Sequence, residues 1–182
     1  LKSVSEGPEK TTHYYYNDDG NIIRETDPSG AKTVRTYDEY GNEKTVTVTR
    51  TAADGSVITM TTENQYDALG RVVRSIDADD FFTVTEYDQV TGKQSVVTDK
   101  RNNSTTYKYD NAGNPEEIIY PDSTTETFVY DGEGNRTEFT DRANRTTTYV
   151  YDELNRLVKT IYPDETYTET GYDVAGRVAW SG

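Results

Sequence analysis

Aspartate is the residue type of this chain that recurs at fixed spacing and could do chemistry. Carboxylates act as acids, bases and calcium ligands. Asp77, Asp79 and Asp80 are the best candidate calcium ligands, because three carboxylates fall within four residues. This cluster lacks the glycine and the distal glutamate of an EF-hand loop. The recurring aspartates elsewhere stand where a side chain caps a turn, which favours a structural role. We therefore expect no metal site.

Nucleophilic catalysis would need a base beside a nucleophile. His13 is the only histidine, and there is no cysteine. A triad would have to join His13 to a serine and a carboxylate from distant parts of the chain. We therefore expect no catalytic residue, no cofactor and no enzymatic activity. The sequons at Asn103, Asn135 and Asn144 would accept a glycan only in a eukaryotic secretory pathway.

Tyrosine is the third residue type with a possible chemical role, and the chain contains 16 of them. Aromatic rings beside Asp, Asn and Arg can stack on sugar faces while their neighbours hydrogen-bond the sugar hydroxyls. A row of exposed tyrosines could therefore bind carbohydrate or a cell surface, as the repeat region of an adhesin-like protein would. The alternative is that the same rings pack against each other and stiffen a sheet that has no second layer. We favour the scaffold over the binding surface.

The recurring aspartates and half of the tyrosines belong to a six-residue phrase, Tyr-Asp-x-x-Gly-Asn/Arg in its fullest form, that occurs eight times. The copies begin at residues 16, 37, 66, 87, 109, 130, 151 and 172, so the steps are 21, 29, 21, 22, 21, 21 and 21 residues. Such a period is the signature of a repeat architecture. The repeated structural positions are Tyr16, Gly20, Tyr37, Asp38, Gly41, Tyr66, Asp67, Gly70, Tyr87, Asp88, Gly92, Tyr109, Asp110, Gly113, Tyr130, Asp131, Gly134, Tyr151, Asp152, Asn155, Tyr172, Asp173 and Gly176.

Each phrase indicates a tight turn. Asp is favoured at the first position of a type I turn and Gly at the fourth, where the chain often turns left-handed. Asp131 and Gly134 fill these two positions. Such a turn makes the three-residue hairpin loop with a G1 bulge. Asn17 stands in place of Asp and Asn155 in place of Gly, and Asn suits both positions.

The elements around the turns are predicted to be short antiparallel strands. A second turn signal, as at 27–30, lies between phrases, and runs of about six residues separate the turns, which is typical of a meander. We expect an all-β fold of tandem hairpins in a curved, twisted, single-layer open sheet of roughly sixteen strands. The 29-residue step is expected to lengthen the hairpin at 45–62 by four residues per strand. Because four is an even number, every side chain stays on the same face of the sheet. We interpret the 22-residue step as a wider turn or a bulge at 88–93.

The side chains of these strands are predicted to divide between two faces. We expect the phrase tyrosines to stack in a ladder on one face, shared by the aromatic residues two positions earlier. The ladder would contain Tyr109, Tyr130, Tyr151 and Tyr172, with Tyr107, Phe128 and Tyr149. The apolar complement is expected from the outgoing strands, at Ile22, Ile23, Val72, Val73, Ile76, Ile118, Phe139, Leu157, Val158, Ile161 and Val178. Because the alternation is imperfect, the sequence leaves open which member of each Ile-Ile or Val-Val pair faces inward.

Composition narrows the possible partners. The formal net charge is −14 and the isoelectric point about 4.4, with 33 acidic residues against 19 basic ones. Phosphate contacts need clustered Lys and Arg, so nucleic acid is not expected as a partner. No apolar run is long enough to span a bilayer, and no leader resembles a signal peptide.

The repeat frame runs past both ends of the chain. Glu6-Gly7-Pro8-Glu9 lies one period before the turn at 27–30, and a strand opened at Gly176-Arg177 stops at Gly182. We interpret residues 1–182 as a single repeat array cut mid-repeat at both ends. Exposed strand edges at the cuts would favour edge-to-edge self-association.

The tandem phrase with Gly-Asn or Gly-Arg at a spacing near 21 residues closely resembles the YD repeats, also called RHS repeats. Proteins of this kind include bacterial Rhs and wall-associated polymorphic toxins, the C components of insecticidal Tc toxins, and teneurins. The resemblance covers essentially the whole chain. It implies a β-sheet ribbon that spirals into a hollow shell, which in the bacterial toxins encloses a toxic C-terminal domain.

For this chain the resemblance implies a segment of shell wall, partnered by the rest of the shell and its enclosed passenger domain. It also implies secretion or display at a cell surface, and we favour a bacterial source because the repeats are short, polar and nearly uniform. The chain departs from toxin-type members, since the Asp-rich self-cleaving signature that ends their shells is not found in it. No residue-level active site carries over from repeats of this kind.

Overall fold

The computed structural model describes residues 2–5 and 11–182, which form 17 β-strands and no helix. These residues divide into two compact units, one up to residue 85 with 99–101, the other of 86–98 and 102–182. The all-β prediction of tandem hairpins is confirmed. The predicted turn at Glu6-Gly7-Pro8-Glu9 lies outside the described residues.

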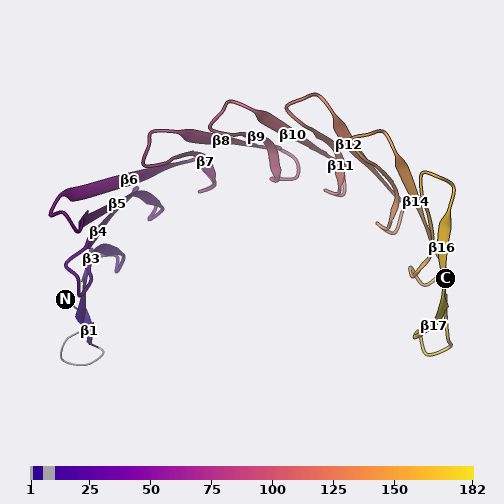
Figure 1. Cartoon of the computed structure of the whole chain (residues 1–182), viewed down its shortest axis with the longest axis horizontal. Coiled ribbons are helices and arrows are strands. Elements are labelled where there is room, and N and C mark those ends of the chain that lie inside the picture. The colour runs from indigo at the N-terminus through magenta and orange to yellow at the C-terminus, as the bar shows by residue number, and fades with distance from the viewer. Residues whose placement is uncertain (1, 6–10) are drawn as a thin grey trace. The chain divides into compact units, whose positions relative to one another are not determined.

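The strands follow one another along the chain in both units (Figure 1). The first eight are β1 (Lys2–Ser5), β2 (Thr11–Tyr16), β3 (Ile22–Thr26), β4 (Lys32–Tyr37), β5 (Glu43–Thr51), β6 (Val57–Tyr66), β7 (Val72–Ile76) and β8 (Phe82–Tyr87). The others are β9 (Gln94–Thr98), β10 (Ser104–Tyr109), β11 (Pro115–Ile119), β12 (Thr125–Tyr130), β13 (Arg136–Thr140), β14 (Thr146–Tyr151), β15 (Leu157–Ile161), β16 (Tyr167–Tyr172) and β17 (Val178–Ser181).

Each strand pairs antiparallel with the next, from β1 to β8 and from β9 to β17. The register shifts just before the phrase tyrosine, as between Val129 and Tyr130. The shift is the bulge that a turn ending in a left-handed residue produces. Within each unit a repeat therefore contributes one hairpin and the connection to the next.

The phrase turns are closed by two backbone hydrogen bonds. Gly134 donates its N–H to the Asp131 carbonyl at 3.1 Å, and Asp131 donates to Asn135 at 3.0 Å. Gly134 has φ +88°, a conformation that costs other residues free energy because of their Cβ atom. The turns between phrases use the same geometry with more varied residues at the left-handed position: Gly30, Gly55, Asp80, Asn102, Ser123, Asn144 and Glu165.

Both irregular steps have the predicted structure. β5 has nine residues and β6 ten, against five in β3 and six in β4, so each strand of the long hairpin gains four. Its pairing is unbroken from Thr45↔Glu63 to Thr51↔Val57. In the 22-residue step Gly92 donates to the Asp88 carbonyl four residues back, so the extra residue lies in a wider turn.

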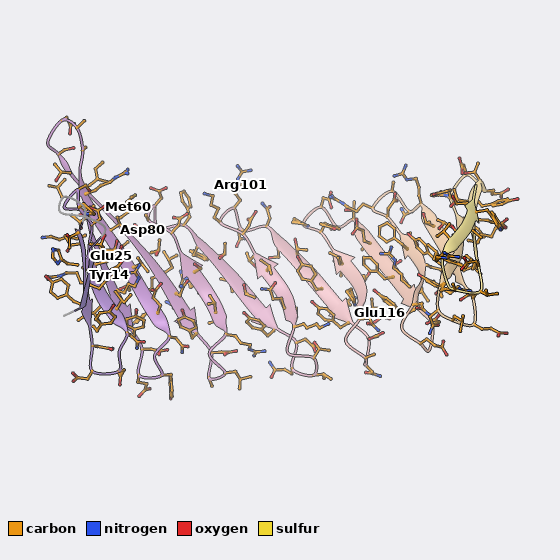
Figure 2. The ribbon with its side chains drawn as sticks, turned by 90° about the horizontal axis from the view of Figure 1, so that it is seen from below. Tyr14, Glu25, Met60, Asp80, Arg101 and Glu116 are labelled. Atoms are coloured by element: carbon orange, nitrogen blue, oxygen red, sulfur yellow. The ribbon has the colours of Figure 1, made fainter. Side chains whose placement is uncertain are left out.

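The described residues contain no buried hydrophobic side chain. Side chains stand on both faces of the ribbon (Figure 2), and the outgoing strands are half-buried at most of the predicted apolar positions. Val178 is 60% exposed, so the prediction of an apolar complement was wrong at this position. In the Ile22-Ile23 pair, Ile22 is half-buried and Ile23 is 37% exposed. One layer of strands has no second layer to cover either face. Hydrogen bonds and partial side-chain contacts therefore carry the fold.

Candidate functional site

The phrase hairpins of each unit are the candidate site, and several of their tyrosines bond the strand that follows the preceding phrase. The Tyr151 hydroxyl donates to the Arg136 carbonyl at 3.1 Å, and the Tyr172 hydroxyl donates to the Leu157 carbonyl at 3.0 Å. Each acceptor is the first residue of the strand that follows the preceding phrase. The same bond runs from Tyr37 to Ile22, from Tyr66 to Glu43 and from Tyr109 to Gln94.

The tyrosines do not form the predicted stacked ladder. Tyr109 and Tyr130 lie on β10 and β12, which β11 separates. Strands two apart are about 9–10 Å from each other, whereas stacked rings need centroids within about 4.5–7 Å. Two aromatic rings do contact each other where they lie directly opposite on neighbouring strands. These are Phe128 and Phe139, whose ring centroids are 5.3 Å apart.

Cations fill the spaces between the rings. The Arg136 guanidinium carbon lies 4.9 Å from the Tyr149 ring centroid and 5.4 Å from that of Phe139. Arg156 lies 4.4 Å from the Tyr172 centroid. The same contact recurs in the other unit, where Arg24 lies 3.6 Å from the ring of Tyr15. Guanidinium groups over aromatic faces are attracted by the ring quadrupole, so these contacts replace ring-on-ring stacking.

The phrase aspartate caps its own turn. Asp131 accepts the N–H groups of Glu133 at 3.1 Å and Asn135 at 2.8 Å through one carboxylate oxygen. Its second oxygen accepts the Asn135 side-chain amide at 3.0 Å. The side-chain bond from Asn135, with the backbone N–H groups, lowers the pKa of Asp131 below its ordinary value. Hydrogen bonds that favour the charged form have this effect.

The sixth phrase residue has a role that sequence reasoning missed. It donates its side chain back to the phrase aspartate, through the amide in Asn42, Asn114 and Asn135 and through the guanidinium in Arg71, Arg156 and Arg177. Arg156 places Nε 2.8 Å and a terminal nitrogen 2.6 Å from the same Asp152 oxygen. The alternation of Asn and Arg at this position was the available signal, since both side chains carry N–H donors.

The other predicted positions occupy the same places in successive repeats. The phrase tyrosines end strands, and the left-handed position is taken by Gly20, Gly41, Gly70, Gly92, Gly113, Gly134, Asn155 and Gly176. Tyr16 is 39% exposed, and desolvation raises the pKa of Tyr130. The structure brings the tyrosine of one phrase to the strand after the preceding phrase. It keeps each aspartate within its own turn.

No group of three or more His, Cys, Asp or Glu side chains in the described range could hold a metal ion. Asp77 accepts the N–H groups of Asp79 and Phe81 at 3.0 and 3.1 Å, so this carboxylate caps a turn. Asp80 takes the left-handed position of that turn, with φ +62°. His13 lies exposed on β2, opposite Thr26.

Two hollows lie between consecutive phrase hairpins. One has a volume of about 700 Å³ and is lined by Asn17, Asp19, Ile23, Tyr37 and Asp38 among others. The other has about 490 Å³ and is lined by the corresponding residues of later repeats: Asp131, Glu133, Thr137, Tyr151 and Asp152. The hollow is therefore a product of the repeat. It combines an aromatic ring with carboxylates and amide or hydroxyl groups.

The family model described as RHS Repeat matches residues 16–57 and 130–167. The matched segments begin at phrase tyrosines, Tyr16 and Tyr130. These two segments are RHS repeats. Within them Tyr37 and Tyr151 make the hydroxyl-to-carbonyl bond, and Asp38 and Asp131 cap their turns. No curated protein matches the chain.

Solved structures share the fold of these RHS repeats. TcdB2-TccC3-Cdc42 is 18% identical with a TM-score of 0.69, over 93% of this chain and 10% of that one. TcdB2-TccC3 without its hypervariable C-terminal region is 17% identical, with the same TM-score and coverage. The Photorhabdus luminescens Tc holotoxin pore, with a TccC3 mutation, is 14% identical with a TM-score of 0.64, over 93% of this chain and 12% of that one.

The chain thus spans about a tenth of the length of these structures. At such identity the likeness is one of fold. In the part of the chain that the structure describes, no helix has the length and apolar character needed to cross a membrane.

Proposed function

We propose that residues 1–182 form one RHS-repeat array that is wall material of a larger secreted bacterial protein. The rest of the wall would enclose a passenger domain and shield it from solvent, proteases and the producing cell. The proposed partners are the neighbouring repeats of the same shell and the passenger. The segment's role is mechanical, and we assign it no catalytic group.

The observation that carries this proposal is the recurring bond from a phrase tyrosine to the preceding repeat. It repeats with the same donor and acceptor positions at Tyr37, Tyr66, Tyr109, Tyr151 and Tyr172. Because the described residues bury no hydrophobic side chain, a repeat depends on its neighbours for stability. Such a sheet can be extended by adding repeats without building a new core, which is what a wall requires.

The similar solved structures support the same proposal. The structures that share the fold are of TcdB2-TccC3 and of a Tc holotoxin pore, and one of them is described as lacking a hypervariable C-terminal region. A hypervariable region at the C-terminal end fits a container with exchangeable contents. The surplus of acidic residues, 33 against 19 basic, supports the solubility of a secreted particle.

Limited proteolysis of the full-length parent protein tests the proposal. We expect the region that follows the repeats to resist protease in the native protein and to be digested quickly when expressed alone. Weakening the wall with Gly134→Val should shorten the lifetime of the protected region, whereas Glu133→Ala, in the same turn, should leave it unchanged. Digestion of that region at the same rate in the parent and in isolation would refute enclosure.

Glycan binding is the second candidate, and the repeated hollow favours it. Both hollows place a phrase tyrosine beside carboxylates and polar side chains, the combination that recognises sugar rings and hydroxyls. Titration of the chain with a panel of oligosaccharides should then give weak saturable binding that Tyr40→Ala, at the rim of the larger hollow, reduces. A flat response to every oligosaccharide would remove this candidate.

A further inference from the structure

The long hairpin leaves part of one strand edge open. β6 pairs with β5 along Val57–Glu63, but β7 pairs only with Glu63–Tyr66. In the part of the chain that the structure describes, no strand pairs with the other edge of β6 between Val57 and Thr61. Figure 2 shows this hairpin, where Met60 is labelled, reaching beyond the neighbouring turns of its unit. Half of the backbone N–H and C=O groups of a strand point to each edge, so this segment carries unused pairing groups.

The open segment has the composition of a pairing strand. Its sequence is Val-Ile-Thr-Met-Thr, with no charge, proline or glycine. Val57 is 68% exposed and Met60 37%. Natural edges are usually protected by charges, proline or bulges, and none of these occurs between Val57 and Thr61. The pairing with β5 is regular throughout, so no bulge interrupts this edge.

We propose that this edge binds the same edge of a second copy of the chain, as an antiparallel two-fold pair centred on Thr59. The cross-strand register places Ile58 and Met60 on one face, and Val57, Thr59 and Thr61 on the other. Pairing about Thr59 sets Ile58 against Met60 of the second copy, Val57 against Thr61, and Thr59 against its own copy. Apolar residues thus meet on one face and β-branched residues on the other.

Charge favours this contact between copies. Two chains of net charge −14 repel each other over most of their surfaces, but the paired segments would bring no charges opposite one another. Thr59 on β6 already shares a hydrogen bond with Thr49 on β5, with 3.4 Å between their hydroxyl oxygens. Threonine pairs of this kind stabilise antiparallel strands. The contact is isologous, so it closes at two copies.

Sedimentation velocity over a range of chain concentrations tests the proposal. The wild type should show a concentration-dependent dimer. Thr59→Lys and Thr59→Glu should each weaken association by at least about tenfold, because the introduced like charges face each other across the two-fold axis. An equimolar mixture of the two variants should restore the dimer. Thr47→Lys adds the same charge to β5, between β4 and β6, and should associate as the wild type does.

Circular dichroism of every variant establishes that the sheet is folded. A wild type that stays monomeric at all concentrations would overturn the proposal. Equal association of Thr59→Lys and Thr47→Lys would also overturn it. That result would mean that the copies associate through another strand edge, such as that of β17. Failure of the mixture to recover would show that the two Thr59 positions are not opposed.

Discussion

Within one phrase, different residues meet different physical demands. The tyrosine bonds the preceding repeat, the aspartate caps the turn and the fifth residue adopts the left-handed conformation, as Tyr151, Asp152 and Asn155 do. The sixth residue holds the aspartate in place, as Arg156 does. Substitutions should therefore differ in cost according to the position they alter.

Gly134 and Gly132 form a matched pair for testing the turn. A Cβ atom added to either would meet nothing within 4 Å, but only Gly134 has a positive φ, +88°. Gly134→Ala should cost on the order of 1 kcal/mol of unfolding free energy, and Gly132→Ala should be neutral or stabilising. Urea denaturation of both variants measures the difference. Equal costs would show that the backbone conformation is not what requires glycine.

Removal of the Tyr151 hydroxyl tests the bond between repeats. Tyr151→Phe keeps the ring but leaves the Arg136 carbonyl without this donor, so we expect a loss of about 1 kcal/mol. Tyr40, 80% exposed, provides the control, because Tyr40→Phe should leave the free energy of unfolding unchanged. A silent Tyr151→Phe would refute the hydroxyl's part in joining repeats.

The turn aspartates predict a stability that acid reduces only at low pH. The pKa of Asp131 is lowered in the folded chain from an ordinary value of 3.8, first by the Asn135 side chain. Its ionised form is therefore favoured by folding. That contribution is fully present above the ordinary value and is lost as the pH falls through the folded pKa.

Wild type and Asp131→Asn provide the measurement, because asparagine cannot titrate. The difference between their unfolding free energies should stay constant between about pH 5 and pH 7 and change in favour of the variant below about pH 4. A difference that changes near pH 6 would contradict this assignment.

The sequence predicted the turns better than the contacts. Asp, Gly and Asn at Asp131, Gly134 and Asn155 have local conformational preferences that need no knowledge of neighbours, and the structure shows hydrogen-bonded turns there. The acceptor of the Tyr151 hydroxyl is a backbone carbonyl 15 residues earlier. A backbone acceptor leaves no mark in the sequence, so rings spaced at regular intervals suggested stacking instead.

Among the elements, the long hairpin shows how the period constrains register. The gain of four residues per strand keeps Thr47, Thr49 and Thr51 in alternation with Val46 and Val48. Its extra length is an even number of residues on each side, which preserves the faces. The extension was predictable because the period and strand alternation are both visible in the sequence. The open edge that it creates was not, since that depends on where β7 ends.

Shortening the hairpin tests this account. Removing Val48–Thr51 together with Val57–Met60 should leave Thr47 opposite Thr61 beside an intact turn, and the chain should fold with the neighbouring strands unchanged. Removing Val48 and Met60 alone should place the remaining tip residues on the opposite faces and destabilise the hairpin. Hydrogen exchange of the β5 and β6 amides distinguishes the two. Equal protection in both variants would contradict the alternation argument.

On the scale of the whole molecule, composition predicted less than the period did. A mean hydropathy of −0.92 and a net charge of −14 are typical of disordered chains, yet the described residues form 17 strands. Tyrosine and threonine supply strand propensity without large apolar area. The exposure of Val178 was not predictable, because it depends on which strands lie beside β17. The repeat frame, counted over eight phrases, decided the fold class.

The lack of buried hydrophobic side chains in the described residues also determines how stability responds to temperature. Unfolding raises heat capacity because apolar groups become hydrated, by about 12–15 cal/mol/K per residue in ordinary domains. This chain should show a clearly smaller increment in scanning calorimetry, and a value within that range would contradict the prediction. A small increment flattens the curve of stability against temperature. The sheet should then be almost as stable in the cold as in warm surroundings, which the proposed role outside the cell would require.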